Sequence, residues 1–153
     1  MNKIIIWIIV VAAVFLSTAF GFWARNQKMA EKNGENSLKI LKIGKTALNI
    51  EVAETNTERE RGLSGRASLG QNEGLLFVFD AEGYYGIWMK GMNFSIDIAW
   101  LDKNKKIIYA EENVLPKTYP EIFNSPAPSL YILETSAGFF KNYGIKIGDV
   151  AEF

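Results

Sequence analysis

Two segments of the chain bring together the side chains that could do chemistry. Residues 55–66 and residues 88–98 mix charged side chains with glycines and bulky apolar side chains. An isolated charge is expensive to bury, so charged groups among such neighbours must pair or accept hydrogen bonds. This mixture predicts a binding site for a polar or anionic ligand. The candidate ligand-binding residues are Arg61, Arg66, Trp88, Lys90 and Asp97, with Glu134 and Asn93 as secondary candidates.

The arginines have a structural interpretation as well as a functional one. Arg61 and Arg66 lie on either side of the glycines that should end a helix. A guanidinium there can bind a carboxylate or phosphate through two hydrogen bonds, or it can pair with Asp97 or Glu134 and stabilise the fold. We favour pairing within the fold. Arg59, in contrast, is expected to be a solvated charge on the helix surface.

The other candidates are weighed in the same way. Asp97 has apolar neighbours on both faces of its predicted strand, so its carboxylate needs a cation or backbone N–H groups as partners. A structural role is therefore favoured for Asp97. Trp88 and Lys90 share a strand face and could form a stacking wall with a hydrogen-bonding head for a sugar or planar ligand. A core tryptophan beside a lysine that extends to solvent explains them equally well.

Composition excludes several kinds of chemistry. The chain has no cysteine and no histidine, which rules out disulfides, cysteine nucleophiles, Cys/His zinc sites and a Ser-His-Asp triad from this chain alone. No metal ion or cofactor is predicted. A glycosidase-like hydrolase is the alternative function, and it needs the carboxyl groups of Asp97 and Glu134 to stand about 5 to 9 Å apart in a cleft. No activated nucleophile or histidine base supports that alternative.

The N-terminal segment is apolar. Residues 4–24 contain no charged side chain, and residues 4–23 would span about 30 Å as a helix, which matches the hydrocarbon core of a bilayer. We expect residues 1–24 to be a transmembrane signal anchor, with a signal peptide cleaved near Ala19 and Gly21 as the alternative. Positive charges on both sides leave the orientation open. Under either interpretation the globular domain is extracytoplasmic, on a single membrane span or secreted.

The rest of the chain is predicted to form a polar linker, residues 25–37, and one globular domain, residues 38–153. A hydrophobic content of 48% is sufficient for one compact core. After Asn33 the chain holds 13 Lys and Arg against 16 Asp and Glu. This acidic balance argues against a nucleic acid as partner.

Alternation of apolar and polar side chains predicts a mostly β domain. A hairpin is expected from residues 38–43 and 47–52, with a turn at Gly44 and Lys45. Many short strands with close turns indicate a curved, antiparallel, barrel-like sheet. The further strands are predicted at residues 75–79, 84–89, 96–101, 106–111, 129–134 and 150–153.

Two short helices should interrupt the sheet, which makes the fold class α+β. Thr55 followed by Glu58 is a capping box, and Gly62 should end this first helix after about two turns. The second helix is predicted at residues 136–143. All four prolines fall within residues 116–128, which predicts a long surface loop that crosses over the site.

Four motifs follow one another along the chain. They are Thr55, Glu58, Arg59, Arg61, Gly62, Leu63 and Arg66; then residues 74–79; then Trp88-Met89-Lys90-Gly91-Met92 with Phe94, Ile96, Asp97 and Ile98; and last residues 131–134, Gly138 and residues 144–149. Together they resemble the domain-of-unknown-function 192 family, DUF192, over about residues 46–153. Asn56 and Ser95 stand where the family often has proline, and Ser64 stands where methionine is usual.

The resemblance implies an α+β fold with a curved or barrel-like antiparallel sheet, and it implies no particular activity. The residues themselves favour a membrane-anchored binding or accessory domain for a polar or anionic small molecule, a glycan or a cell-envelope component. The alternatives are the hydrolase and a purely structural partner in an envelope complex. Charged side chains that converge on an open concavity would favour binding.

Overall fold

The structure, a computed structural model, describes residues 39–153. The predicted transmembrane segment at residues 1–24 and the predicted linker at residues 25–37 lie outside the described residues. Among the described residues, no helix has the length and apolar character needed to cross a membrane.

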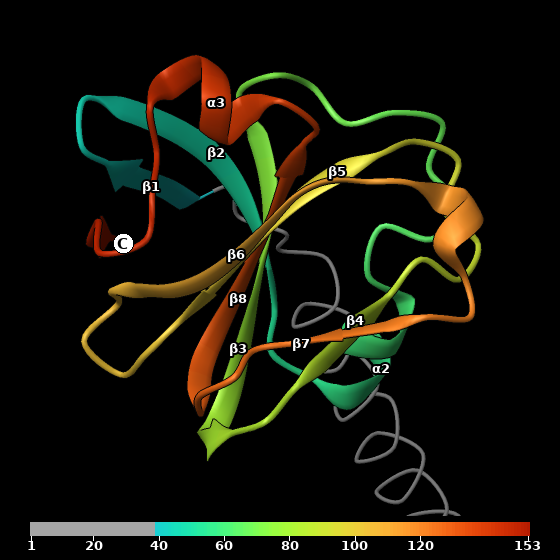
Figure 1. The fold of residues 1–153 in the computed structure, drawn as a ribbon, viewed down its shortest axis with the longest axis horizontal. Helices are drawn as coiled ribbons and strands as arrows, with labels where there is room; N and C mark the ends of the chain where they lie inside the picture. Colours follow the sequence, from blue (N-terminus) through green and yellow to red (C-terminus); the bar gives the residue numbers. More distant parts are fainter. Residues whose placement is uncertain (1–38) are drawn as a thin grey trace, which may run out of the picture. The chain divides into compact units, whose positions relative to one another are not determined.

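Seven strands form one sheet in the order β6-β5-β8-β3-β2-β1-β9, and two further strands, β4 and β7, pair with each other (Figure 1). The strands are β1 (Lys39–Ile43), β2 (Thr46–Ala53), β3 (Glu73–Gly83), β4 (Gly86–Trp88), β5 (Ile96–Leu101), β6 (Ile107–Val114), β7 (Ile122–Asn124), β8 (Ser129–Ser136) and β9 (Ala151–Glu152). The helices are α2 (Asn56–Arg61), α3 (Phe139–Tyr143) and the 3₁₀ turn η1 (Pro116–Thr118). The mostly β, α+β class with two short helices is confirmed.

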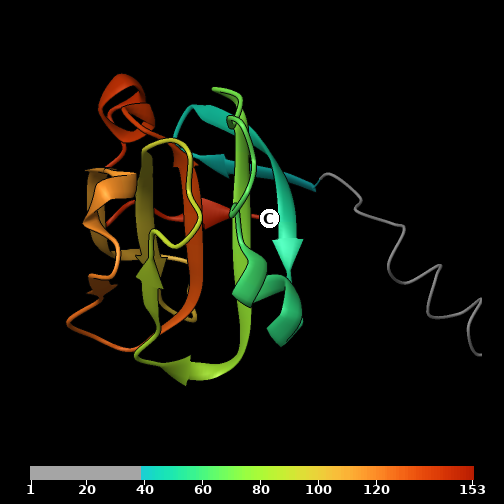
Figure 2. The same ribbon diagram turned by 90° about the vertical axis from the view of Figure 1, so that its right-hand side faces the viewer.

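The large sheet curls like part of a barrel. Its two edges meet at an isolated bridge between Lys106 and Val150, beside a 2.8 Å hydrogen bond from Ile107 N to Asp149 O. This contact pairs backbone groups that an open edge would leave unpaired. Figures 1 and 2 show the strands crossing as the sheet coils, with α3 at one end and α2 at the other.

One strand pair departs from the antiparallel prediction. β2 and β3 run parallel, with Val52 opposite Leu76. Residues 54–72, which include α2, form the crossover that returns the chain to the starting end of the sheet, as a parallel pair requires. Alternation of side chains identifies a strand but carries no information on its direction relative to a neighbour, so this pairing was not evident from the sequence.

The second predicted helix begins later than expected. β8 continues through Ser136, which pairs with Ile96 of β5. Gly138 then adopts a left-handed conformation with φ of 83°, and α3 starts at Phe139. Ser136, which was predicted to begin the helix, therefore belongs to the strand. The first helix, the opening hairpin and β5 lie where they were predicted.

The proline-rich stretch is more ordered than a long loop. Within residues 116–128 the chain forms η1 and then β7. β7 pairs antiparallel with β4, which places Ile122 opposite Trp88. The expectation that this stretch is not a central strand is met, since β7 belongs to the separate two-stranded sheet.

Both faces of the large sheet are covered. On one, here called the α3 face, Ala99 and Leu133 pack against Phe139 and Phe140 of α3. On the other, here called the α2 face, the packed residues include Leu63 after α2, Ile87 of β4, and Ile98 and Ile132 of the sheet. Because side chains alternate along a strand, each strand contributes to both cores.

Candidate functional site

The two motif-bearing segments lie side by side, as their mixed composition predicted. Three hydrogen bonds join them: Ser64 Oγ donates to Lys90 O at 2.7 Å, Gly65 N donates to Gly91 O at 2.9 Å, and Asn93 Nδ2 donates to Arg66 O at 2.8 Å. Asn93, a secondary ligand-binding candidate, therefore contacts the backbone of the loop that carries Arg66. Together the segments cover part of the α2 face.

A capping box fixes the residue at which α2 begins. Thr55 Oγ1 accepts a hydrogen bond from Glu58 N at 3.2 Å, and Glu58 Oε2 accepts one from Thr55 N at 2.8 Å. The backbone and side-chain hydrogen bonds from Thr55 lower the pKa of the Glu58 carboxyl. α2 ends at Gly62, whose φ of 50° and ψ of −133° suit a residue without a Cβ atom.

Arg59 is not the solvated charge that the sequence predicted. Its Nη1 donates to Val78 O at 2.6 Å and to Glu54 O at 2.7 Å, and its Nη2 donates to Asn56 Oδ1. The guanidinium also lies 5.1 Å from the centre of the Phe79 ring. Arg59 thus ties α2 to β3, and most of its donors are already engaged.

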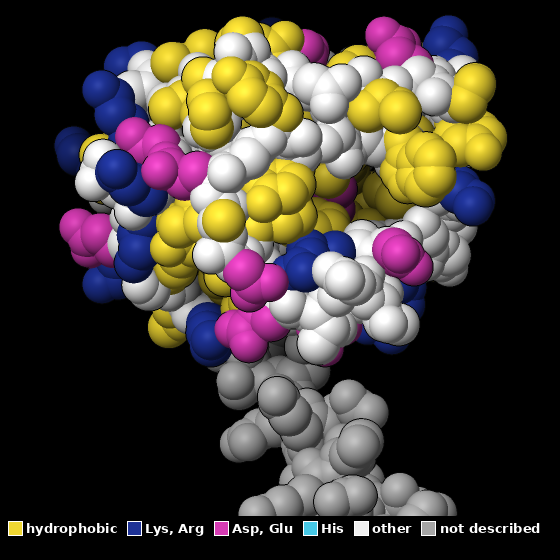
Figure 3. Space-filling model, turned by 90° about the horizontal axis from the view of Figure 1, so that it is seen from below, with side chains coloured by type: hydrophobic (Ala, Val, Ile, Leu, Met, Phe, Trp, Pro, Cys, Tyr) yellow, Lys and Arg dark blue, Asp and Glu magenta, His cyan; other side chains and the backbone are white. Residues whose placement is uncertain are grey.

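A cavity opens on the α2 face between α2 and β4. Its volume is about 60 Å³, enough for a few water molecules or one small chemical group. Figure 3 views the domain from this side and shows a hollow with hydrophobic side chains above and beside it, Lys or Arg side chains below it, and acidic atoms visible inside. The lining residues are Arg59, Glu60, Arg61, Gly62, Leu63, Ser64, Phe77, Gly86, Ile87, Trp88, Met92 and Glu134.

Glu134 is the buried polar group of this cavity. Its side chain belongs to a residue only 5% exposed, and its Oε2 has no hydrogen-bond partner among the described residues. Burial raises the pKa of this carboxyl to about 8, against a smaller lowering by the charge of Arg66. The carboxyl is therefore mostly neutral at pH 7, and a buried neutral acid can both donate and accept a hydrogen bond.

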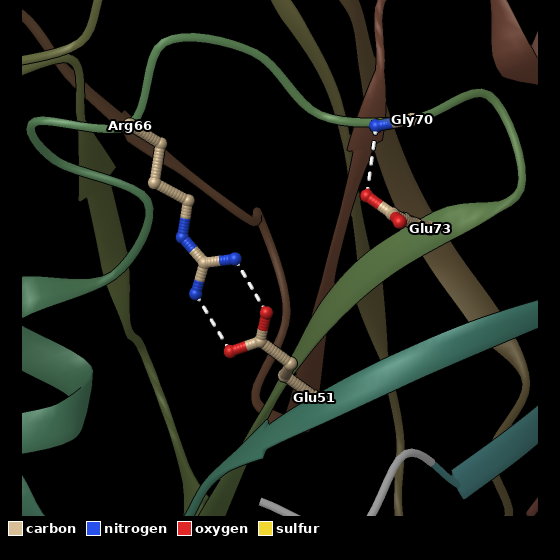
Figure 4. Close-up of polar contacts among 4 residues, drawn as sticks. All are labelled: Glu51, Arg66, Gly70 and Glu73. Carbon is tan, nitrogen blue, oxygen red and sulfur yellow. Dashed lines mark hydrogen bonds and ion pairs between the residues drawn. The ribbon is translucent and has the colours of Figure 1, made fainter.

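Arg66 pairs with an acid that the sequence did not single out. Its guanidinium binds Glu51 of β2 through both nitrogens, with Nη2 donating to Oε2 at 2.7 Å (Figure 4). In strand register Glu51 lies opposite Leu75, and Leu75 lies opposite Glu134. The two acids therefore share the α2 face, two strands apart, at about 10 Å between Cα atoms. The predicted pairing of Arg66 with Asp97 or Glu134 is corrected accordingly.

Asp97 does not belong to this cavity. It is fully buried and lies opposite Thr135 in the sheet, so its side chain is on the α3 face. Its Oδ1 accepts from Asn113 N at 2.8 Å and Gly138 N at 3.1 Å, and its Oδ2 accepts from Phe140 N at 3.0 Å. The favoured structural role is confirmed, and the grouping of Asp97 with the arginines as ligand-binding residues is corrected.

The hydrolase alternative fails on the same geometry. Glu134 lies opposite Ile98, the residue that follows Asp97 in β5. Because successive side chains of a strand point to opposite faces, the two carboxyl groups are on opposite faces of the sheet. A pair that must act on one glycosidic bond has to face one cleft. Asp97 also has no access to solvent.

The rim of the cavity is aromatic and exposed. Trp88 lines the cavity and is 47% exposed. Its ring meets that of Tyr119 edge-on, with 6.0 Å between centroids, and Lys90 Nζ lies 5.2 Å from its centroid. Ile122, opposite Trp88 in the two-stranded sheet, is also exposed. Trp88 is therefore not a core residue, and the interpretation as a stacking wall fits its position.

Arg61 completes the site. Its exposed side chain lines the cavity, and within residues 39–153 its guanidinium has no hydrogen bond or ion pair, unlike those of Arg59 and Arg66. The favoured pairing of Arg61 with Asp97 or Glu134 is therefore wrong. In the same residues, no group of three or more acidic side chains could hold a metal ion. The site thus joins Arg61, Trp88 and Glu134, while Arg66 acts on Glu134 through its charge.

Sequence reasoning missed Glu51 and the engagement of Arg59. Glu51 had a signal, because in β2 it alternates with the apolar side chains of Leu48, Ile50 and Val52 and so had to face the other side of the sheet. The contact between Glu51 and Arg66 depends on the crossover through α2, which brings Arg66 over this face of the sheet. For Arg59 there was no signal, since its acceptors are mostly backbone carbonyls.

Comparison with known proteins places this domain. A family model, DUF192, described as an uncharacterized ACR, matches residues 39–153. A crystal structure of a protein from Sinorhizobium meliloti 1021, described as a candidate transcription regulator, is similar with a TM-score of 0.71 and 29% identity, over 74% of this chain and 91% of that chain. A protein of unknown function from Novosphingobium aromaticivorans DSM 12444 is similar with a TM-score of 0.70 and 27% identity, over 74% and 84%. No curated protein matches the chain. Because the family model covers all of the described residues, the chain belongs to the DUF192 family.

Proposed function

We propose that this domain is a binding module without catalytic activity of its own, and that it takes up a small polar group of its ligand in the cavity between α2 and β4. One observation carries the proposal: Glu134 Oε2 is buried in the cavity without a hydrogen-bond partner in the part of the chain that the structure describes. A buried polar atom left unpaired costs about 1 to 3 kcal/mol. A ligand that pairs with it recovers part of that cost.

The surroundings support recognition more than catalysis. The cavity combines apolar side chains, among them Leu63, Phe77 and Ile87, with charged and polar ones. Arg61 and Trp88 are its exposed lining residues. Polar groups that converge beside apolar and aromatic side chains are typical of a ligand site. A reaction would also need an activated nucleophile or a second positioned acid or base. Glu60, the other acid that lines the cavity, is exposed.

A fragment screen tests this function. The full-length chain in a neutral detergent is titrated with small polar fragments of all charges, and backbone amide shifts are followed by NMR. We expect hits to shift the amides of Gly62, Leu63 and Ile87, which line the cavity. Glu134→Leu should abolish these hits while the fold persists, and Glu134→Gln should keep part of them. A screen in which no fragment of any class shifts these amides refutes the function.

The location of the module is a proposal from the sequence. The apolar stretch at residues 4–23 supports a single-pass anchor with the domain outside the cytoplasm, where a glycan or envelope component is the natural ligand or partner. A reporter that is active only outside the cytoplasm, fused after Phe153, tests it. Activity of this reporter is expected. Activity of a second reporter, one that works only in the cytoplasm and is fused at the same point, would contradict the proposed location. The acidic balance of the domain does not favour a nucleic acid as partner.

A further inference from the structure

We propose that the ligand group recognised in the cavity is a carboxylate, bound by the buried carboxyl of Glu134 and by the guanidinium of Arg61. The inference rests on the proposed function, and it names the chemical class that the same site accepts. It would make the domain a receptor for a low-molecular-weight organic acid or for a carboxylate group of a larger ligand.

The first step is the hydrogen-bonding capacity at the buried end of the cavity. Glu134 Oε2 is without a partner among residues 39–153, and the residue is 5% exposed. As a neutral acid it offers one O–H donor. The ligand group that complements this donor is a hydrogen-bond acceptor. A carboxylate is a strong acceptor, because a hydrogen bond from a neutral acid to a carboxylate is charge-assisted.

The second step is the sign of the charges around the cavity. α2 contributes Arg59, Glu60 and Arg61 to the lining, whereas the β4 residues in the lining carry no charge. The loop after α2 adds Arg66, whose charge acts on Glu134. The charge of Arg66 is balanced by its pair with Glu51. With Glu134 neutral, the lining then carries the positive charges of Arg59 and Arg61 against the negative charge of Glu60. This favours an anion and opposes entry of a cation.

The third step separates the available cation from the engaged ones. Arg59 donates to three oxygen acceptors, and Arg66 is held by both oxygens of Glu51. Arg61 is exposed and without an ion pair in the described part of the chain, although its charge helps to lower the pKa of Glu58. Its long side chain can therefore turn toward a bound anion without breaking a hydrogen bond or an ion pair. A guanidinium pairs well with a carboxylate because its planar fork matches the two oxygens.

The protonation of Glu134 makes the inference testable by pH. Burial raises the pKa of its carboxyl to about 8. If binding requires the neutral acid, the apparent affinity follows the neutral fraction. That fraction falls about tenfold between pH 7 and pH 9. A cation that bound the ionised carboxylate would show the opposite dependence.

The experiment uses three probes of similar size and different charge: acetate, acetamide and methylammonium. Each is titrated into the full-length chain in a neutral detergent, and the amides of Gly62, Leu63 and Ile87 are followed by NMR at pH 6 to 9. Acetate is expected to bind most tightly, with an affinity that falls about tenfold from pH 7 to pH 9. Glu134→Gln should keep acetate binding, through its amide donor, and remove the pH dependence.

Two further variants form a matched pair. Arg61→Ala should weaken acetate binding several-fold. Lys141→Ala should leave it unchanged, because Lys141 is likewise an exposed cation in the last turn of a short helix but does not line the cavity. Equal losses in both variants would mean that acetate responds to net charge alone, and would overturn the assignment to Arg61.

Other results would overturn the inference and leave the function standing. Methylammonium that binds better than acetate, or more tightly as pH rises, would make the cavity a cation site. Acetamide that binds as well as acetate would show that charge is not recognised. If fragments of every class fail at these amides, the proposed function itself is wrong.

Discussion

Asp97 and Glu134 lie on adjacent strands of one sheet, yet their carboxyl groups are on opposite faces. Asp97 is opposite Thr135, and Glu134 is opposite Ile98. Both acids are buried. Asp97 accepts hydrogen bonds from three backbone N–H groups, whereas Glu134 Oε2 accepts none from the described residues. The two acids belong to neighbouring pairs of β5 and β8, and this offset of one residue puts them on different faces. One acid therefore stabilises the fold, and the other is available to a ligand.

The stability of the domain should decrease with pH because of Glu134. The folded-state pKa of about 8 lies above the 4.5 of an unperturbed glutamate, so between these values the folded protein holds a proton that the unfolded chain has released. Stability from this group is complete below pH 4.5 and is lost as pH rises toward 8. The total change should be on the order of 3 to 5 kcal/mol.

Glu134→Gln tests this dependence, since the amide does not titrate. We expect the variant to gain stability relative to the native chain when the pH is raised from 5 to 8, measured by denaturant unfolding at both values. Titrations of all other groups cancel in that comparison. Stability curves that stay parallel across this range would show that Glu134 is not protonated in the folded protein.

Arg66→Gln should raise the pKa of Glu134 further. The charge of Arg66 lowers that pKa, although burial has the larger and opposite effect. Removing the guanidinium removes the lowering. The measurement is an NMR titration of the Glu134 carboxyl carbon in both chains. An unchanged or lower pKa in the variant would mean that Arg66 does not act on this carboxyl.

Asp97→Asn should destabilise the fold by about 2 to 4 kcal/mol. In the native chain both carboxylate oxygens accept backbone N–H groups, and in the variant an amide nitrogen, itself a donor, would take the place of one of those oxygens. Asp102→Asn is the matched control. Asp102 Oδ1 also accepts two backbone N–H groups, from Asn104 and Lys106, but at an exposed turn, where water can replace the lost acceptor. Its cost should be below about 1 kcal/mol. Equal costs would contradict the role assigned to Asp97.

Trp88→Ala should weaken the binding of carboxylates that carry an aromatic tail. The tail of 3-phenylpropanoate can reach the exposed face of Trp88, and an aromatic contact of this kind contributes about 1 kcal/mol, or roughly fivefold in affinity. Acetate, which has no tail, should be unaffected. Tyr84→Ala is the control, since Tyr84 is 68% exposed but does not line the cavity. A loss of acetate binding in Trp88→Ala would mean that Trp88 shapes the cavity itself.

Local signals were sufficient for much of the fold. Alternation located β5, and the Thr55 capping box located α2, because both signals depend on neighbours within a few residues. The start of α3 was misplaced because Ser136 is held in β8 by pairing with β5. Long-range hydrogen bonds overrode the local preference there.

The sequence by itself determined the family, the strand pattern and the segments that would carry the site, since these follow from local periodicity and from motifs in fixed order. It also showed that Asp97 needs partners, because both faces of its strand are apolar. Tertiary structure alone decided that backbone N–H groups satisfy Asp97 and that Glu51 neutralises Arg66. It also decided that Glu134 Oε2 lies in a cavity without a partner among residues 39–153. The reason is that strand register and the crossover through α2 decide which side chains meet, and neither is encoded within a single segment.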